Sequence, residues 1–174
     1  MVKLLLFRQL TIKIIKLKET KIILTRGIQG SGKSTWAKKW VEEDPEHRVR
    51  WNNDEFRRML GPYWSPEREH LVSGLRSEFL SRAMLFGYDI VIDNMNLNDW
   101  NWNDVQRKID DFNRSVFGLK SKKRYTLEFK DFFDISLEEC IERDSKRENP
   151  IGEKVITETY DRYKDIIKKL KNNG

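Results

Sequence analysis

The stretch over residues 21–35 reads Lys-Ile-Ile-Leu-Thr-Arg-Gly-Ile-Gln-Gly-Ser-Gly-Lys-Ser-Thr. It begins with a largely apolar run that is typical of a buried strand. The run leads into the pattern G-x-x-x-x-G-K-[ST], which spans Gly27–Ser34. Glycine at positions 27, 30 and 32 lets the backbone wrap so that successive N–H groups point at one anion. The stretch therefore predicts a strand, a phosphate-binding loop and a helix that begins near Ser34.

The side chains of this loop suit a nucleoside triphosphate, either ATP or another one. Lys33 supplies a mobile positive charge for the terminal phosphates, and the Ser34 hydroxyl can ligate the Mg²⁺ that accompanies them. A glycine-rich turn without a ligand is the alternative. We expect the nucleotide to contact Gly27, Gly30, Ser31, Gly32, Lys33, Ser34 and Thr35.

The composition predicts one folded domain. The chain has 174 residues, of which 38% are hydrophobic and 11% aromatic, so it can bury a single sizeable core. Its one cysteine, Cys140, excludes an intramolecular disulfide, and no Cys/His cluster indicates zinc. No segment has the pattern of a membrane span or of a secretory signal peptide. We therefore expect a cytoplasmic protein that does not enter a membrane.

Positive charge is concentrated at the N-terminus. The 34 basic and 28 acidic residues give a net charge of +6. Residues 1–21 contain six Lys or Arg residues and one acid, Glu19, so they carry +5 of this total. The rest of the chain is nearly neutral, and the net charge therefore says little about what the cleft binds.

This charge distribution divides the chain into a basic N-terminal extension, residues 1–20, and a domain, residues 21–174. The extension contains both helical and alternating apolar spacings. It can pack on the outside of the domain or on a partner chain, which would produce self-association. The alternatives are a basic arm for nucleic acid and a frayed end.

Strand patterns alternate with helix patterns through the domain. The predicted strands are residues 21–25, 48–51, 89–93 and 125–130, and the alternation in the last of them predicts either a strand with one solvated face or an edge strand. The longest predicted helix begins at Ser65 and ends at Gly87, and its apolar face consists of Leu71, Val72, Leu75, Phe79, Ala83 and Met84. Such alternation predicts an α/β fold, with a parallel sheet of about four to five strands flanked by helices. Ligands of such sheets gather at the carboxyl ends of the strands.

Local signals place two further helices. Ser136 and Glu139 form a capping box, and Ile135 can pack onto Cys140 there, so we interpret Cys140 as a core residue and not as a nucleophile. The basic run Lys120–Arg124 is either a solvated loop or a surface that contacts phosphate. The apolar face of the last predicted helix consists of Ile156, Tyr160, Tyr163, Ile167 and Leu170.

Two residues after the second predicted strand are candidates for the acceptor half of a transferase site. Asp54 is expected across the cleft from Lys33, where a carboxylate can accept the proton of an acceptor hydroxyl. Its alternative role is the N-cap of a helix that begins at Glu55. Arg57 follows on the same helical face, where it can hold an anionic acceptor with two hydrogen bonds or remain solvated.

Three other residues are candidates for the donor half. Asp93 ends a central strand and can orient Ser34, Lys33 or a metal-bound water; a turn-capping role is the alternative. Arg143 and Arg147 are separated by one helical turn and can point at the same anion. They suit a flap that closes over phosphates, with salt bridges to neighbouring acids as the alternative.

The chain resembles the kinase domain of phage-type polynucleotide 5′-hydroxyl kinases, which belong to the P-loop phosphotransferase superfamily. The resemblance extends over roughly residues 21–170 in motif order. It implies a P-loop kinase-like three-layer sandwich that transfers the γ-phosphate of ATP or another NTP to the 5′-OH end of RNA or DNA in nucleic-acid end repair. The motifs are Lys21–Trp36, Asn52-Asn-Asp-Glu-Phe-Arg57, Asp93-Asn-Met-Asn-Leu-Asn98 and Arg143-Asp-Ser-Lys-Arg147.

The same resemblance assigns roles to individual residues. It implies that Lys33 and Ser34 serve the triphosphate and Mg²⁺, and that Asp54 is the general base on the 5′-OH. Arg57 would grip the phosphate next to the acceptor end, and Arg147 would be the lid arginine on the donor phosphates. The remaining two matches are supports of the same site, with Asp93 near the metal and Arg143 near the nucleotide.

The sequence departs from the family pattern at Arg26, Ile28-Gln29 and Met95. These departures leave the phosphoryl chemistry in place and bear on the preferred donor base and acceptor. The D-x-D-G-T phosphatase module that such kinases often carry does not occur, so we expect no 3′-phosphatase activity.

Two other functions remain open. A small-metabolite kinase of the shikimate or gluconate type would share the loop, the fold and the arginine lid. A nucleotide-dependent switch module would use hydrolysis for signalling, but the sequence has no N-K-x-D motif and no D-x-x-G after a strand.

Overall fold

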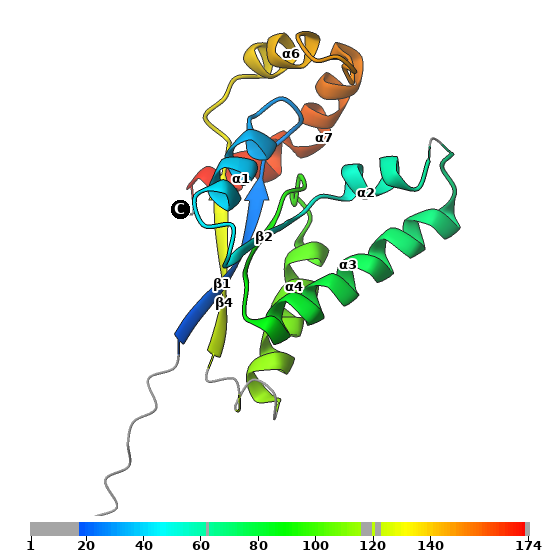
Figure 1. The fold of residues 1–174 in the computed structure, drawn as a ribbon. Coiled ribbons are helices and arrows are strands. Elements are labelled where there is room, and N and C mark those ends of the chain that lie inside the picture. Colours follow the sequence, from blue (N-terminus) through cyan, green and yellow to red (C-terminus); the bar gives the residue numbers. More distant parts are fainter. Residues whose placement is uncertain (1–17, 62, 116–119, 121–122, 173–174) are drawn as a thin grey trace, which may run out of the picture.

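The computed structural model describes residues 18–61, 63–115, 120 and 123–172 (Figure 1). Its centre is one sheet of four strands, in which all neighbours run parallel and the order is β2-β3-β1-β4. The strands are β1 (Lys18–Arg26), β2 (Arg48–Trp51), β3 (Asp89–Ile92) and β4 (Lys123–Asp131). The predicted α/β fold with a parallel sheet is therefore confirmed.

The central strand β1 begins at Lys18, three residues before the predicted start. It pairs with β4 along its whole length and with β3 over residues 22–24. The last residues of the predicted N-terminal extension thus belong to the sheet. Residues 1–17, and with them the predicted self-association, lie outside the described part of the chain.

The strand β4 lies at the edge of the sheet, which is one of the two arrangements that its alternating sequence predicts. It pairs with β1 alone among the described strands, and most of its side chains are exposed. It begins at Lys123, so the last two residues of the basic run Lys120–Arg124 belong to a strand and not to a loop. Residues 121 and 122 are outside the described part.

The local signals for helix ends are confirmed. Ser65 accepts a hydrogen bond from the backbone N–H of Arg68, and Ser136 accepts one from Glu139. Gly87 ends its helix in the left-handed conformation, with φ of 79°. The described helices are α1 (Lys33–Glu42), α2 (Asn53–Met59), α3 (Pro66–Phe86), α4 (Asp99–Arg114), α6 (Leu137–Ser145) and α7 (Glu153–Asn172).

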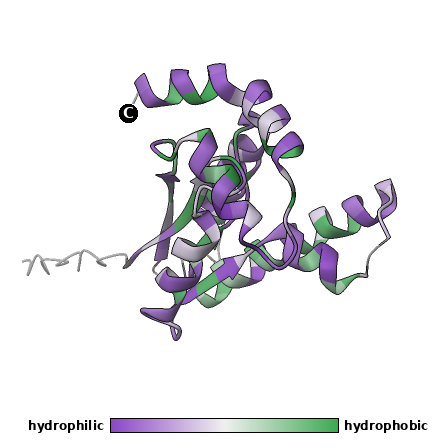
Figure 2. Cartoon of the chain, turned by 90° about the horizontal axis from the view of Figure 1, so that it is seen from above, coloured by the Kyte–Doolittle hydropathy of each residue, from purple (hydrophilic) through white to green (hydrophobic). Residues whose placement is uncertain are grey.

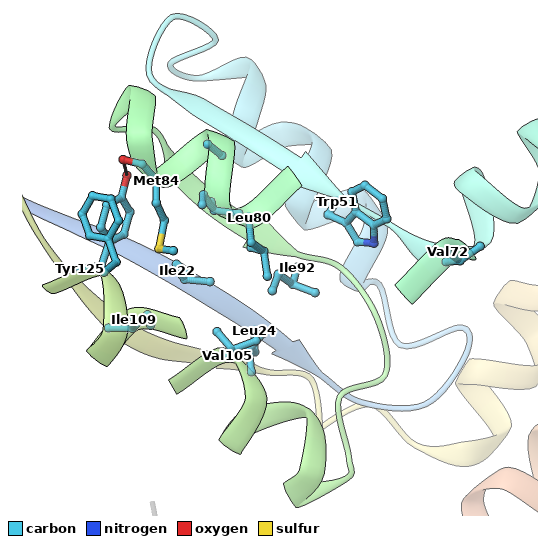
Figure 3. Packing of buried hydrophobic residues seen from close by; sticks show 13 residues of the cluster. Ile22, Leu24, Trp51, Val72, Leu80, Met84, Ile92, Val105, Ile109 and Tyr125 are labelled. Atoms are coloured by element: carbon cyan, nitrogen blue, oxygen red, sulfur yellow. Dashed lines mark hydrogen bonds between the residues drawn. The ribbon is translucent and has the colours of Figure 1, made fainter. Parts of the chain in front are cut away.

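The sheet is buried on both faces, which makes the domain a three-layer sandwich. On one face, Ile22 and Leu24 of β1 pack against α3 and α4 (Figure 3). On the opposite face, Ile23 packs against Ala37 and Trp40 of α1. The main cluster consists of Ile22, Leu24, Trp51, Val72, Leu80, Ala83, Met84, Ile90, Ile92, Val105, Ile109, Phe112 and Tyr125.

The predicted apolar face of α3 is confirmed at Val72, Ala83 and Met84 but is wrong at two positions in the first half of the helix. Leu71 and Leu75 were expected on the apolar face of this helix, but they are 48% and 36% exposed. Leu80 and, unexpectedly for a charged residue, Arg76 are buried instead. The physical reason is that α2 and the first half of α3 project from the body of the molecule, where no sheet lies beneath them (Figures 1 and 2). Hydrophobic periodicity marks a helical face but not how far the neighbouring sheet extends.

A second, smaller core joins the phosphate-binding loop to α6 and α7. Its buried members include Ile28 of the loop, Cys140 of α6 and Ile156 of α7. Cys140 is fully buried, which confirms that it is a core residue. None of the described helices is both long enough and apolar enough to cross a membrane.

Candidate functional site

The phosphate-binding loop takes the backbone path that its glycines predict. Gly27, Gly30 and Gly32 have φ values of 152°, 79° and 97°, in the region that side chains disfavour. The loop also lies directly against α6: a Cβ atom added to Gly30 would be 2.2 Å from the carbonyl oxygen of Cys140. Glycine at this position is therefore required by both the dihedral angle and the close approach of α6.

Lys33 lies inside this loop. The side chain is buried, and its Nζ donates to the carbonyl oxygen of Ile28 at 2.6 Å and to Ser31 Oγ at 3.5 Å. Burial lowers the pKa of Lys33 to about 8, while the nearby Asp93 acts in the opposite direction. An anion bound in the loop would offset the cost of burying this charge. The next residues, Ser34 and Thr35, are exposed on the first turn of α1.

Asp93 lies at the carboxyl end of β3 and is 1% exposed. Its Oδ2 accepts hydrogen bonds from Nε and Nη2 of Arg50, at 2.9 and 2.5 Å, and from Nδ2 of Asn52 at 3.3 Å. Its Oδ1 is buried and has no hydrogen-bond partner among the described residues. The carboxylate is thus held by side chains of the β2 segment and keeps one oxygen available for a ligand.

Asp54 and Arg57 form a pair on α2. The N-cap of α2 is Asn52, whose side chain accepts from the backbone N–H of Glu55 at 2.9 Å, so Asp54 does not cap the helix. The Asp54 side chain is 72% exposed and its Oδ1 lies 2.5 Å from Nη1 of Arg57. Its charge also acts on the Lys33 ammonium and raises the pKa of Lys33, against the larger effect of burial. Asp54 therefore lies near enough to Lys33 for its charge to act there, although more weakly than the charges of Asp93 and Arg147.

Arg57 is held in place by a second carboxylate that the sequence did not reveal. Glu69 of α3 accepts from its Nε at 2.7 Å and from its Nη2 at 2.8 Å. The hydrogen bond to Glu69 is the main reason why the pKa of Arg57 is raised. A guanidinium has five N–H groups, and Glu69 and Asp54 use three of them. The other two have no partner among the described residues.

Arg143 and Arg147 occupy different surroundings. Arg143 lies on α6 and pairs with Glu139. Its Nη1 is so near the loop that a Cβ atom added to Gly32 would be 3.4 Å from it. Arg147 lies beyond the end of α6, so the predicted helical spacing of the two arginines does not extend to it. Its Nη1 is 3.1 Å from Oδ1 of Asp144.

Both arginines remain able to reach a ligand. Their side chains are 43% and 45% exposed, respectively. The positive charge of Arg147 also lowers the pKa of Lys33, after the larger effect of burial, which places it in the electrostatic surroundings of the loop. The structure therefore brings the loop, Lys33 and these two arginines together, and places Asp54 within electrostatic reach.

Comparison with known proteins identifies the family. A family model described as an AAA domain, AAA_33, matches residues 22–170. The chain belongs to this family. A solved structure titled "Structure of the Pnkp1/Rnl/Hen1 RNA repair complex" contains a chain 22% identical to it, with a TM-score of 0.64; the match covers 89% of this chain and 46% of that chain.

A second structure, titled "Structure of Pnkp1/Rnl/Hen1 complex", matches with 24% identity and a TM-score of 0.54, over 71% of this chain and 38% of that chain. At these identities the likeness establishes the fold, and the AAA_33 domain spans less than half the length of either chain. The predicted P-loop kinase-like fold is thereby confirmed.

The entry to the loop of this AAA_33 domain is anchored by Arg26, which the sequence marked as a departure from the family pattern. Its Nε and Nη2 donate to the two carboxylate oxygens of Asp131 on β4, both at 2.6 Å. The guanidinium carbon lies 4.1 Å from the ring centroid of Phe129. The next residue, Gly27, donates its backbone N–H to the carbonyl oxygen of Met95 at 3.2 Å. The loop therefore begins at a fixed point between β4 and the segment after β3.

The donor set of the AAA_33 domain fits a nucleotide with Mg²⁺. Among the described residues no group of three or more His, Cys, Asp and Glu side chains could hold a metal without another ligand. Oxygens available near the loop include the exposed Ser34 hydroxyl and the buried, unsatisfied Oδ1 of Asp93. Such a sparse set suits Mg²⁺, which usually takes most of its ligands from phosphate and water.

Sequence analysis missed Arg50, Asn52 and Glu69. The signal for the first two was their position: Trp51 and Ile92 are paired in the sheet, so residues at the end of β2 lie beside Asp93. Glu69 offered no such signal, because its contact with Arg57 depends on how α2 and α3 are placed relative to each other.

Proposed function

We propose that this AAA_33 domain is a polynucleotide 5′-hydroxyl kinase that transfers the γ-phosphate of ATP or another NTP to the 5′-OH end of RNA or DNA. The observation that carries the proposal is the Asp54–Arg57 pair, which combines an exposed carboxylate with a guanidinium that keeps two N–H groups available. A strand end offers the matching groups, a hydroxyl and a nearby phosphate. RNA is the first acceptor to test, because the titles of the similar structures name Pnkp1 and an RNA repair complex.

The donor half of the site follows from the loop geometry. The backbone N–H groups of Gly27–Ser34 and the Lys33 ammonium would bind the phosphates of the nucleotide. Ser34 and Asp93 would hold the Mg²⁺, directly or through water, and this ion would offset the negative charge of the phosphates. Arg143 and Arg147 would close over the same phosphates, once their carboxylate partners release them.

The acceptor half supplies position and a base. The two remaining N–H groups of Arg57 would bind the phosphate that follows the terminal nucleoside, which fixes the 5′-OH near Asp54. The Asp54 carboxylate takes the proton of the 5′-hydroxyl while the 5′ oxygen of the acceptor forms a bond to the γ-phosphorus. The bond between that phosphorus and the leaving oxygen of the nucleoside diphosphate breaks in the same step. Lys33 and the arginines stabilise the charge that develops on the transferred group.

The test is transfer of radiolabelled γ-phosphate from ATP to a 5′-OH RNA oligonucleotide, with the same oligonucleotide bearing a 5′-phosphate as the blank. We expect Asp54→Asn to lower turnover by about 10²–10⁴-fold with ATP affinity retained, because the general base is lost. Asp111→Asn is the matched control, since Asp111 is also exposed and paired with an arginine three residues on.

Two results would contradict the proposal. Failure to label both RNA and DNA while ATP binds normally would reject it, and labelling of small polyols or acids instead would favour a small-metabolite kinase. If Asp54→Ala and Arg57→Ala left all phosphate transfer unchanged, a nucleotide-dependent switch would be the better interpretation.

A further inference from the structure

The projecting part of the molecule contains a cavity of about 390 Å³ between α2 and the start of α3. It begins at Arg57 and extends along α2 to the segment that joins the two helices. Its volume lies in the range of sites for small organic ligands. Residues that line it include Arg57, Leu60, Tyr63, Trp64, Arg68 and Val72.

Two large aromatic side chains stand open to solvent at this cavity. Tyr63 is 69% exposed and Trp64 is 66% exposed. The part of the chain that carries them projects from the body of the domain (Figure 2). Neighbouring exposed aromatic rings at a cavity are typical of a binding surface, because their apolar faces gain most when a flat ligand covers them.

The segment that carries the rings is held firmly by Arg68. Its Nη1 donates to the carbonyl oxygen of Leu60 at 2.7 Å and to that of Tyr63 at 3.0 Å. Its guanidinium carbon lies 5.4 Å from the centroid of the Tyr63 ring. The Glu69 carboxylate, whose pKa is lowered mainly by its hydrogen bonds to Arg57, also interacts electrostatically with the Trp64 side chain. Arg68 therefore holds the backbone at Tyr63 and lies near its ring, and Glu69 lies near Trp64.

Glu69 also connects this cavity to the acceptor half of the site. The same carboxylate holds Arg57 through two hydrogen bonds. Three arginines, at positions 57, 58 and 68, line the cavity together with one acid, so its surroundings are positively charged. Positive charge beside flat aromatic faces matches a single-stranded nucleic acid, which offers phosphates and bases in turn.

We propose that this cavity holds the base of the second nucleotide of the acceptor strand, the nucleotide on the 3′ side of the phosphate that Arg57 would bind. This inference rests on the proposed function. The order of groups along α2, with Asp54 first, then Arg57, then the cavity, follows the order of a strand that begins with its 5′-OH. The described residues that line the cavity include no Asn or Gln, and the carboxylate of Glu69 is occupied by Arg57, so we expect recognition mainly by stacking, which any base can provide.

The test compares two acceptors. One is adenosine 3′-phosphate, and the other is the dinucleotide in which the 3′-phosphate of the first adenosine is joined to a second adenosine 3′-phosphate. Wild-type protein should use the dinucleotide with a kcat/KM about tenfold higher, mainly through KM, because one stacked base is gained. In Trp64→Ala this ratio should fall to near one, and Trp64→Phe should restore most of it. Trp100→Ala is the matched control, since Trp100 on α4 is similarly exposed at 63% and should leave the ratio unchanged.

The outcomes separate this inference from the proposed function. A wild-type ratio near one, or a Trp64→Ala ratio equal to that of wild type in a folded protein, would overturn the inference while phosphate transfer itself stands. If no acceptor is phosphorylated, the proposed function fails. Fluorescence anisotropy of a labelled 5′-OH oligonucleotide then tests the cavity directly, with weaker binding expected in Trp64→Ala and unchanged binding rejecting the inference.

Discussion

Lys33 shows how one residue is adjusted by its surroundings. The ammonium is buried in a loop whose own carbonyl group binds it, and burial lowers its pKa to about 8. The carboxylate of Asp93 limits this shift, and the charge of Arg147 adds to it. The loop therefore keeps a cation close to its deprotonation point, and a bound anion would complete the charge balance.

At pH 8, ATP binding should cause uptake of about half a proton per site, since half of the Lys33 side chains are neutral there and a bound anion raises their pKa. Calorimetric titrations in buffers of different ionisation enthalpy measure this uptake. Lys33→Met should bind ATP more weakly and remove the uptake. Equal proton uptake in the variant, or proton release by the wild type, would show that another group is responsible.

The same shift has a consequence for stability. The pKa of Lys33 in the folded protein, about 8, lies below its ordinary value of 10.5, so the unfolded chain binds more protons between these values. Lys33 therefore makes the free energy of unfolding rise with pH through this window. The difference in unfolding midpoint between wild type and Lys33→Met, followed from pH 7 to pH 10, isolates this contribution.

At the scale of elements, the phosphate-binding loop depends on α6 for its shape. The backbone of Cys140 touches Gly30, and the guanidinium of Arg143 lies beside Gly32. On the other side, Arg26 fixes the start of the loop to Asp131 of β4. The loop is thus clamped between β4 and α6, so that its N–H groups can point inward without a ligand to organise them.

Gly30→Ala should lower the free energy of unfolding by at least about 2 kcal/mol, because the left-handed backbone disfavours a side chain and the new Cβ overlaps the α6 backbone. This corresponds to a thermal midpoint lower by at least about 4 °C for a chain of this size. Gly74→Ala is the control: Gly74 lies inside α3 with nothing within 4 Å of an added Cβ, and its replacement should stabilise by up to about 1 kcal/mol. Thermal unfolding of both variants checks the pair, and a similar effect in both would contradict the clamp.

At the scale of the whole molecule, the chain has two cores with the phosphate-binding loop at their boundary. The larger core joins the sheet to α3 and α4, and the smaller one joins the loop to α6 and α7. The residues of the proposed acceptor half lie on the opposite, projecting part formed by α2 and α3 (Figure 1). Under the proposed function, this division would let Arg143 and Arg147 adjust to the donor while Asp54 and Arg57 keep their own support.

Saturating ATP with Mg²⁺ should therefore protect α6 and the start of α7 from hydrogen exchange more than it protects β2 and β3. At a concentration of about 100 times the Kd, the ligand should add about 2.7 kcal/mol to the free energy of unfolding. In Arg147→Ala the added protection of α6 should be largely lost. Hydrogen exchange with mass spectrometry measures both, and uniform protection of all segments would contradict closure by α6.

The sequence by itself determined the phosphate-binding loop and the class of fold. The pattern over Gly27–Ser34 demands one backbone path and one set of charges, and alternating strand and helix periods allow little besides a parallel sheet. Cap residues such as Ser65 and Ser136 accept a hydrogen bond from a backbone N–H group three residues later in the chain, so the local sequence is enough to predict this interaction.

Only the tertiary structure decided which distant groups meet. Arg50 holds Asp93 because β2 lies beside β3, and Glu69 of α3 holds Arg57 of α2 because α3 lies against α2. The extent of the sheet likewise decided that Leu71 and Leu75 of α3 stay exposed. Such contacts depend on the relative placement of elements, which is fixed by the packing of the whole core and leaves no local trace in the residues concerned.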